Sequence, residues 1–398
     1  MFVPSTKQLI SLALLGVLAG CSPQVKKVTP TEAGTRQWNG TRANVLASLG
    51  RDQYEAGNFE KARQSFNDAI RLDPENANIR ILSARLAIEQ AQIELAEKEL
   101  RLARQFDPKS AEAEYLSGVV YQRWQKPDLA YEFYSHASDK APADISYLMA
   151  KSEMLVAMDR APEALKMLQD KVIYFEHSAA IRDAVGELLV GQKKYVAAAD
   201  MLRQASMLTP DDATLKEHLG LAEFYAREYE EAALVLDKLL KDARYAKRSD
   251  LHAALGECRF ELGKYREARD SFDIATKIDP GTAGLWLGLG KCALQLGDQR
   301  RAELALKKAI SIDPASSEVN LLIGYLRLRQ NRLPEALVAF KAAGGAEAGD
   351  TVSMCMTGYV LEKLGRTDEA IQYYGRALKR NPNDELATKL MAGIQLHE

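Results

Sequence analysis

The chain has few cysteines and histidines and almost no net charge. Its 398 residues include four cysteines and five histidines, and the formal net charge is −2. A balanced charge offers no basic face of the kind that nucleic acid requires. The histidines are scattered, with no HExxH motif and no cysteine–histidine spacing, so we expect no metal site. No paired catalytic constellation stands out, and we expect no cofactor, no small-molecule substrate and no enzymatic activity.

Long apolar runs are also missing, apart from one near the N-terminus. Residues 9–17 are apolar but too few to span a hydrocarbon core of roughly 30 Å. The string Leu18-Ala19-Gly20-Cys21 follows and resembles the bacterial lipobox, in which a signal peptide is cleaved before the cysteine. The resemblance implies a signal peptide over residues 1–20 and a diacylglycerol on Cys21. An ordinary signal peptide with an incidental cysteine is the alternative.

A lipid on Cys21 would hold the chain on a membrane without spanning it, because more than one acyl chain gives durable anchoring. Ser22 follows the cysteine where inner-membrane retention signals of the enterobacterial type have Asp. The resemblance therefore favours the periplasmic face of the outer membrane of a bacterial envelope.

Three segments have the composition of flexible connections. Residues 21–42 contain proline, threonine and lysine with little apolar periodicity, so we expect a tether. Residues 243–248 interrupt the regular spacing, and residues 344–349 are rich in glycine. Either joint can be a hinge or a merely lengthened loop, since glycine has a high ordering cost.

What the chain does have is a repeat. Ten alanines recur every 34 residues, with a single step of 36, at Ala62, Ala96, Ala130, Ala164, Ala198, Ala232, Ala268, Ala302, Ala336 and Ala370. A small residue stands twelve places before each alanine, and a proline stands twelve places after most of them. A period of this length indicates stacked units that bury one another's apolar faces.

Each unit has the pattern of a helix–turn–helix. In the unit over residues 249–282, Leu255 and Phe260 recur at helical spacing, and Gly263 ends that helix. A second apolar stripe then includes Ala268 and Phe272. The small residues let the two helices approach closely. Cys258, Cys292 and Cys355 fall inside such helices, and we interpret them as small buried residues without a disulfide.

The small residue, the alanine, the following aromatic or leucine and the closing proline together resemble tetratricopeptide repeats. This resemblance implies an all-α fold, a right-handed superhelical solenoid of about ten units with a capping helix over residues 385–398. The units are residues 43–76, 77–110, 111–144, 145–178, 179–212, 213–248, 249–282, 283–316, 317–350 and 351–384.

In that family the first helix of each unit lines a concave groove that binds peptides or partner helices. The corresponding positions here predict a basic entrance, an acidic middle and an apolar and aromatic end; alternatively, the acids simply belong to solvated helix faces. The candidate residues are Arg51, Arg85, Tyr115, Glu153, Asp183, Glu187, Glu217, Glu257, Lys291, Leu321, Tyr325 and Tyr359.

Anchor, tether and groove together are similar to repeat lipoproteins that assist assembly of pili or of secretion and export complexes. The chain is therefore expected to be a scaffold for envelope proteins or peptides. A regulatory scaffold for peptidoglycan hydrolases or synthases is the second hypothesis. An enzyme fused to repeats is the third, although the repeats leave it little room.

Overall fold

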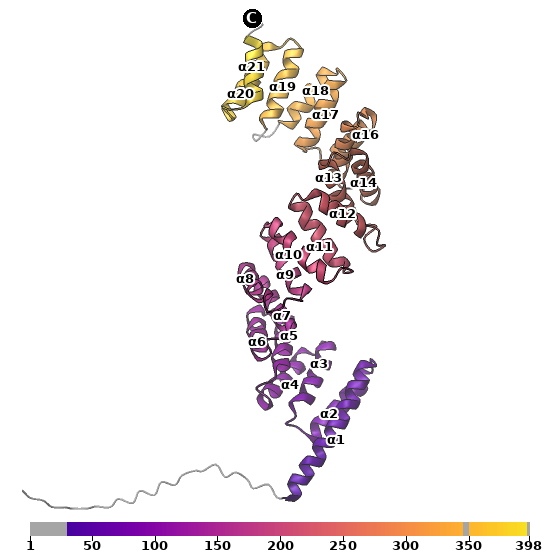
Figure 1. Cartoon of the computed structure of the whole chain (residues 1–398), viewed down its shortest axis with the longest axis vertical. Helices are drawn as coiled ribbons and strands as arrows, with labels where there is room; N and C mark the ends of the chain where they lie inside the picture. The colour runs from indigo at the N-terminus through magenta and orange to yellow at the C-terminus, as the bar shows by residue number, and fades with distance from the viewer. Residues whose placement is uncertain (1–29, 345–349, 396–398) are drawn as a thin grey trace, which may run out of the picture. The chain divides into compact units, whose positions relative to one another are not determined.

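A computed structural model describes residues 30–344 and 350–395. All regular secondary structure in these two ranges is α-helical, which confirms the all-α repeat fold (Figure 1). The predicted signal peptide, Cys21 and residues 345–349 lie outside the described residues. The described residues form two compact units, divided between residues 147 and 148.

The helices follow one another in pairs. Those of the N-terminal unit are α1 (Pro30–Glu55), α2 (Phe59–Leu72), α3 (Ala77–Glu89), α4 (Ile93–Phe106), α5 (Ala111–Arg123) and α6 (Pro127–Lys140), and α7 (Ile145–Ala157) crosses the boundary between the units. The C-terminal unit continues with α8 (Ala161–Val172), α9 (Ala179–Gly191), α10 (Tyr195–Leu208), α11 (Ala213–Tyr225), α12 (Tyr229–Leu239), α13 (Ser249–Glu261), α14 (Tyr265–Ile278), α15 (Ala283–Gln295), α16 (Gln299–Ile312), α17 (Ser317–Arg329), α18 (Leu333–Ala343), α19 (Thr351–Lys363), α20 (Thr367–Arg380) and α21 (Glu385–Gln395).

The turn inside each pair contains one residue in the left-handed region of backbone space. Gly263 takes this conformation, with φ of 73°, as its place at the end of α13 predicted. Six of the ten turns use a residue other than glycine at the same position: Ala91, Gln125, Asp159, Lys193, Arg227 and Asn331. The turn geometry is therefore kept even where the side chain disfavours it.

Side chains define several other helix ends. Pro127, Pro162 and Pro334 each lie in the first turn of a second helix, where a missing N–H is tolerated. Ser178 and Asp212 cap α9 and α11 by accepting hydrogen bonds from backbone N–H groups of the first turn.

Each pair is closed by a small residue facing a large one. All ten repeat alanines are fully buried. A Cβ atom added to Gly118 would lie 2.4 Å from the Tyr134 ring, and one added to Gly256 would lie 2.9 Å from the Phe272 ring. The two helices therefore approach as closely as glycine allows, as the sequence predicted.

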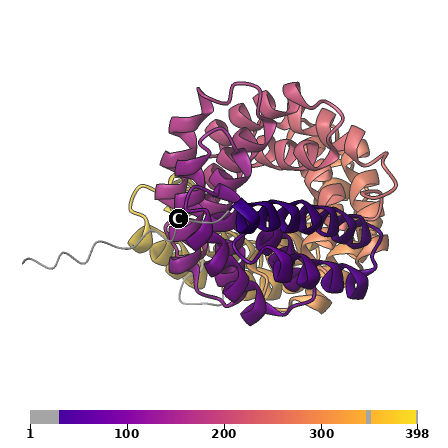
Figure 2. The same cartoon turned by 90° about the horizontal axis from the view of Figure 1, so that it is seen from below.

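Successive pairs stack in chain order within each unit (Figure 2). In the C-terminal unit the odd-numbered helices also contact one another, α9 with α11, α11 with α13, α13 with α15 and α15 with α17. Successive even-numbered helices of the described residues are farther apart. The odd-numbered helices therefore form the more closely spaced layer of this stack, toward which it curves.

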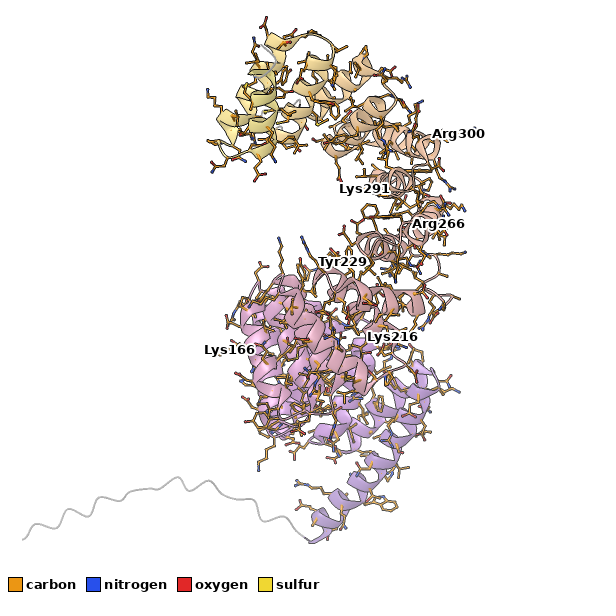
Figure 3. All side chains as sticks on the ribbon, turned by 45° about the horizontal axis from the view of Figure 1, so that its top comes forward. Lys166, Lys216, Tyr229, Arg266, Lys291 and Arg300 are labelled. Carbon is orange, nitrogen blue, oxygen red and sulfur yellow. The ribbon has the colours of Figure 1, made fainter. Side chains whose placement is uncertain are left out.

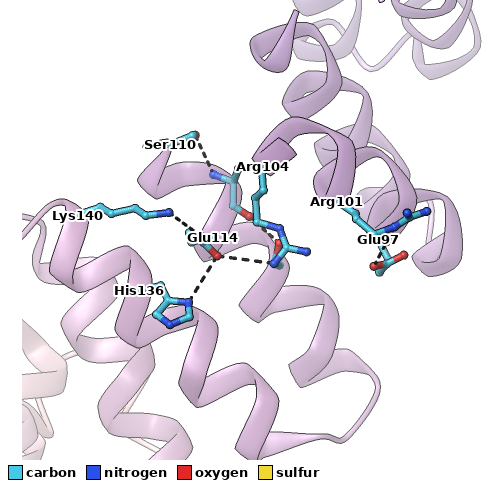
Figure 4. Close-up of polar contacts among 9 residues, drawn as sticks. Glu97, Arg101, Arg104, Ser110, Glu114, His136 and Lys140 are labelled. Carbon is cyan, nitrogen blue, oxygen red and sulfur yellow. Dashed lines mark hydrogen bonds and ion pairs between the residues drawn. The ribbon is translucent and has the colours of Figure 1, made fainter. Parts of the chain in front are cut away.

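An ion cluster joins three helices of the N-terminal unit (Figure 4). The Glu114 carboxylate of α5 lies 2.5 Å from Lys140 Nζ of α6 and 3.7 Å from a guanidinium nitrogen of Arg104 on α4. His136 Nδ1 of α6 lies 3.9 Å from the same carboxylate. Because Glu114 is buried, Lys140 and Arg104 stabilise a charge that would otherwise be costly.

The predicted tether is wrong for residues 30–42, because α1 begins at Pro30. Proline favours the first position of a helix, and Glu32 in the first turn complements its dipole. This part of α1 is largely exposed, so it carries no apolar stripe from which a helix could be inferred.

The structure confirms the predictions for the cysteines of the repeats and for the C-terminal helix. Cys258, Cys292 and Cys355 are buried free thiols, and burial raises the pKa of the Cys258 thiol to about 12. The helix α21 begins at Glu385, where the capping helix was predicted. Hinge motion at residues 243–248, which form hydrogen-bonded turns between α12 and α13, stays a prediction.

Candidate binding groove

The predicted groove residues all lie on odd-numbered helices. They are Arg51 on α1, Arg85 on α3, Tyr115 on α5, Glu153 on α7, Asp183 and Glu187 on α9, Glu217 on α11, Glu257 on α13, Lys291 on α15, Leu321 and Tyr325 on α17 and Tyr359 on α19. Each is exposed or only partly buried. Figure 3 shows Lys291 on the opposite side of the stack to Arg266 of α14 and Arg300 of α16. In this part of the C-terminal unit, α15 thus presents its groove residue on the side away from α14 and α16.

The N-terminal unit offers less free basic charge than its sequence indicated. Arg85 forms an ion pair of 2.7 Å with Glu112 of α5. Tyr115 packs its ring against Tyr147 and Tyr134, with centroids 4.9 and 5.4 Å apart. The Arg85 charge and the Tyr115 ring are therefore engaged within this unit.

The acidic groove candidates of the C-terminal unit include one that pairs with an arginine and two that do not pair with lysine or arginine. Glu217 forms an ion pair of 2.9 Å with Arg248, which compensates its charge. Glu153 and Glu187 are exposed, and neither is offset by lysine or arginine at ion-pair distance in the described residues. The unbalanced negative charge is therefore concentrated on α7 and α9.

Glu153 and Glu187 lie on the lining of a pocket between α7 and α9. Its volume is about 550 Å³. Most of the lining is apolar and includes Met149, Val156 and Leu188. The Val156 side chain is 44% exposed, so a ligand can contact it. The pocket therefore combines apolar walls with two carboxylates.

The next repeats carry a partly buried acid, Glu257, near a lysine. Burial raises the pKa of the Glu257 carboxyl, and the charge of Lys291 acts in the opposite direction. Lys291 itself lies 2.5 Å from Glu318 of α17. Lys291 offsets one of these two carboxylates, so the three residues together contribute less to the field of the groove than Glu153 and Glu187.

The aromatic end of the predicted groove is partly used for packing. Tyr325 meets Phe340 edge to face, with centroids 5.3 Å apart, and burial raises the pKa of its hydroxyl. Leu321 packs against the same hydrophobic core. Tyr359 has the Lys363 ammonium 5.4 Å from its ring centroid. Only part of each aromatic surface is open to a ligand.

His218 of α11 also lies on this surface, although it is not one of the predicted groove residues. Its Nδ1 lies 2.8 Å from Asp183 and its Nε2 lies 3.4 Å from Glu187. The repeat period contained the signal, because His218 follows Asp183 by 35 residues, one more than the period. We expected no metal site from linear motifs, and those cannot detect ligands that come from neighbouring repeats.

Paired helices closed by a small residue against a large one define a tetratricopeptide-repeat scaffold, a class that mediates protein–protein interaction. A family model described as the cilia and flagella-associated protein 70 C-terminal domain matches residues 175–398, and a tetratricopeptide-repeat model matches residues 53–118. The chain belongs to the first of these families, and the predicted tetratricopeptide repeats are confirmed.

Curated relatives match part of the chain. BBSome complex member BBS4 of Bos taurus is 21% identical over 221 residues, which cover 56% of this chain and 42% of the relative. The Homo sapiens protein O-mannosyl-transferase TMTC1 is 26% identical over 183 residues, which cover 45% of this chain and 21% of the relative. The chain thus spans less than half the length of these relatives.

Among solved structures, the tetratricopeptide-repeat protein YrrB is 20% identical with a TM-score of 0.41, covering 48% of this chain and 97% of YrrB. Its title describes an unusual peptide-binding site. In the described part of the chain, every helix is too short or too polar to cross a membrane.

Proposed function

We propose that the protein is a lipid-anchored adaptor of a bacterial envelope, held at the periplasmic face of the outer membrane through Cys21. Its groove holds a basic, partly apolar segment of an envelope protein and assists assembly of a pilus, secretion or export complex. The lipobox-like string before Cys21 supports the anchor. A relative named as a member of a multiprotein complex is consistent with a role in assembly.

The pocket between α7 and α9 is the observation that carries the ligand proposal. Met149, Val156 and Leu188 would bury an apolar side chain of the partner. Glu153 and Glu187 would meet a lysine or arginine on either side of it. Complementary charges fix register and speed association, while the apolar contact supplies most of the affinity.

A titration of the full chain tests this proposal. The probe is a fluorescein-labelled peptide in which one leucine is flanked by lysines, and its counterpart has glutamates in place of the lysines. We expect the lysine peptide to bind and the glutamate peptide not to bind. The double variant Glu153→Gln with Glu187→Gln should weaken binding about tenfold or more, equivalent to roughly 1.4 kcal/mol.

Two further variants separate the groove from general electrostatics. Val156→Ser removes an exposed apolar contact and should also weaken binding. Asp170→Asn, an exposed acid on the even-numbered helix α8, should leave it unchanged. Equal affinities of the two peptides, or equal effects of the groove and α8 variants, would refute the site.

The anchor and the partner are tested in cells. Wild-type protein should fractionate with the membrane, and Cys21→Ser should be released from it. Co-purification of pilus, secretion or export subunits supports the assembly role. Murein hydrolases or synthases among the co-purified proteins would instead favour the regulatory scaffold.

A further inference from the structure

Three potential metal ligands converge between two helices of the C-terminal unit. Asp183 and Glu187 lie one turn apart on α9, and His218 faces them from α11. One ligand atom from each side chain lies within 4.8 Å of the other two. Two carboxylates and an imidazole are a ligand set that suits Zn²⁺ and related divalent ions.

The spacing of two of these atoms suits a single metal ion. His218 Nε2 lies 3.4 Å from Glu187 Oε1. Ligands bound tetrahedrally to Zn²⁺ at about 2.1 Å are separated by about 3.4 Å. One cation can therefore reach both atoms with little movement of either side chain.

Asp183 has a different part in the cluster. Its carboxylate lies 2.8 Å from Nδ1 of His218, and it accepts a hydrogen bond from that nitrogen when the nitrogen carries the proton. The contact orients the ring and leaves the Nε2 lone pair directed at the cation position. A carboxylate behind a metal-binding histidine is the usual orienting partner.

The surroundings allow a cation to enter. The Glu187 side chain is 58% exposed, and the His218 side chain is 25% exposed. With a neutral imidazole the three side chains carry two negative charges, which a divalent cation would neutralise. The nearby Glu217 is paired with Arg248, so the charge at this place comes mainly from α9.

We propose that Glu187 and His218 bind one divalent cation of the zinc class, that Asp183 orients His218, and that water completes the coordination shell. The site lies on the surface proposed for the partner and shares Glu187 with its pocket, but it stands on its own geometry. His218 donates a hydrogen bond to the Asp183 carboxylate, and this contact raises the pKa of His218.

Isothermal titration of the full chain with ZnCl₂ alone tests the site, with MgCl₂ as the comparison ion. We expect one saturable Zn²⁺ site and no comparable Mg²⁺ binding, because Mg²⁺ prefers six oxygen ligands. His218→Ala and Glu187→Gln should abolish it. Asp183→Asn should weaken Zn²⁺ binding about 10-fold to 100-fold, as loss of an orienting partner does.

His136→Ala is the matched control. His136 also has a carboxylate neighbour, Glu114 at 3.9 Å, but lacks a second one at ion-pair distance in the described residues. Its replacement should leave Zn²⁺ affinity unchanged, with circular dichroism confirming that all variants remain helical. Absence of saturable binding, or Zn²⁺ binding that survives His218→Ala, overturns the proposal. A histidine-specific shift of the His218 ring resonances on adding Zn²⁺ would support it independently of affinity.

Discussion

Glu303 of α16 shows how a single carboxylate contributes stability between two repeats. It accepts a hydrogen bond of 3.0 Å from Arg327 of α17, whose side chain is only 9% exposed, and it pairs with Lys307 at 3.0 Å. Arg327, followed by Lys307, lowers the pKa of the Glu303 carboxyl from 4.5 to about 2. The folded chain therefore binds this proton less readily than the unfolded chain does.

Because the folded pKa is depressed, the stabilisation is fully present above pH 4.5 and is lost as the pH falls toward 2. We predict that Glu303→Gln lowers the free energy of unfolding by about 1–2 kcal/mol at pH 7, in the range of charged hydrogen bonds. The difference from the wild type should shrink through that acidic window in urea titrations. Glu261→Gln, which alters an exposed acid of α13, is the control and should show neither effect. A Glu303→Gln deficit that persists unchanged at pH 2.5 would contradict this account.

The sequence predicts which helices carry the groove residues, but not which of their charges are paired. The period placed the twelve candidates on one set of helices, because equivalent positions of stacked repeats face the same way. It could not show that Arg248 compensates Glu217 or that Glu112 compensates Arg85, since these contacts depend on side-chain direction between neighbouring helices. That Glu153 and Glu187 of the pocket have no lysine or arginine at ion-pair distance in the described residues also emerged only from the structure.

At the scale of one helix pair, the close approach of α19 and α20 depends on Gly358. A Cβ atom there would lie 2.4 Å from Cε1 of Tyr374. That ring is fully buried, and its hydroxyl lies 3.1 Å from Glu362, so it has little freedom to move. We predict that Gly358→Ala destabilises the pair by about 1–3 kcal/mol, the usual cost of overpacking.

Gly375 on α20 provides the matched control, because a Cβ atom there meets nothing within 4 Å. Gly375→Ala should raise stability by up to about 1 kcal/mol, since alanine is the better helix former. Urea midpoints of the two variants should therefore move in opposite directions from the wild type. Equal shifts would show that helix propensity, and not the contact with Tyr374, governs this pair.

The sequence predicted helices that bury a row of apolar side chains, and it did not predict helical residues that lack such a row. The pairs follow from alanines such as Ala268 and from large residues such as Phe272, which must meet the same neighbours in each unit. The first residues of α1 are mostly polar and exposed, so their composition predicted a tether. The left-handed residues of the turns were equally hidden, because Lys193 and Arg227 are not typical of that conformation.

At the scale of the array, each helix pair buries its apolar face on the element that follows it. In the described residues α21 covers the pair formed by α19 and α20. Ile394 and Leu390 pack against the core formed by Val360 and Tyr374. The Asp384 carboxylate accepts a hydrogen bond of 2.5 Å from the Thr351 hydroxyl, which ties the start of α21 to α19. Terminal units with a polar outer face are what keep such arrays soluble.

We predict that Ile394→Asp detaches α21, because Ile394 is 5% exposed and a buried unpaired carboxylate is costly. The free energy of unfolding of α19 and α20 should fall by about 2–4 kcal/mol, a range similar to that of large-to-small substitutions in apolar cores. Hydrogen exchange in α19 and α20 should accelerate, while α13 and α14, several repeats away, keep their protection because each repeat is stabilised mainly by its neighbours. Leu386→Asp, at a position of α21 that is 39% exposed, should leave exchange unchanged. If α19 and α20 keep wild-type protection in Ile394→Asp, the last pair is stable without its cover and α21 is not the element that ends the array.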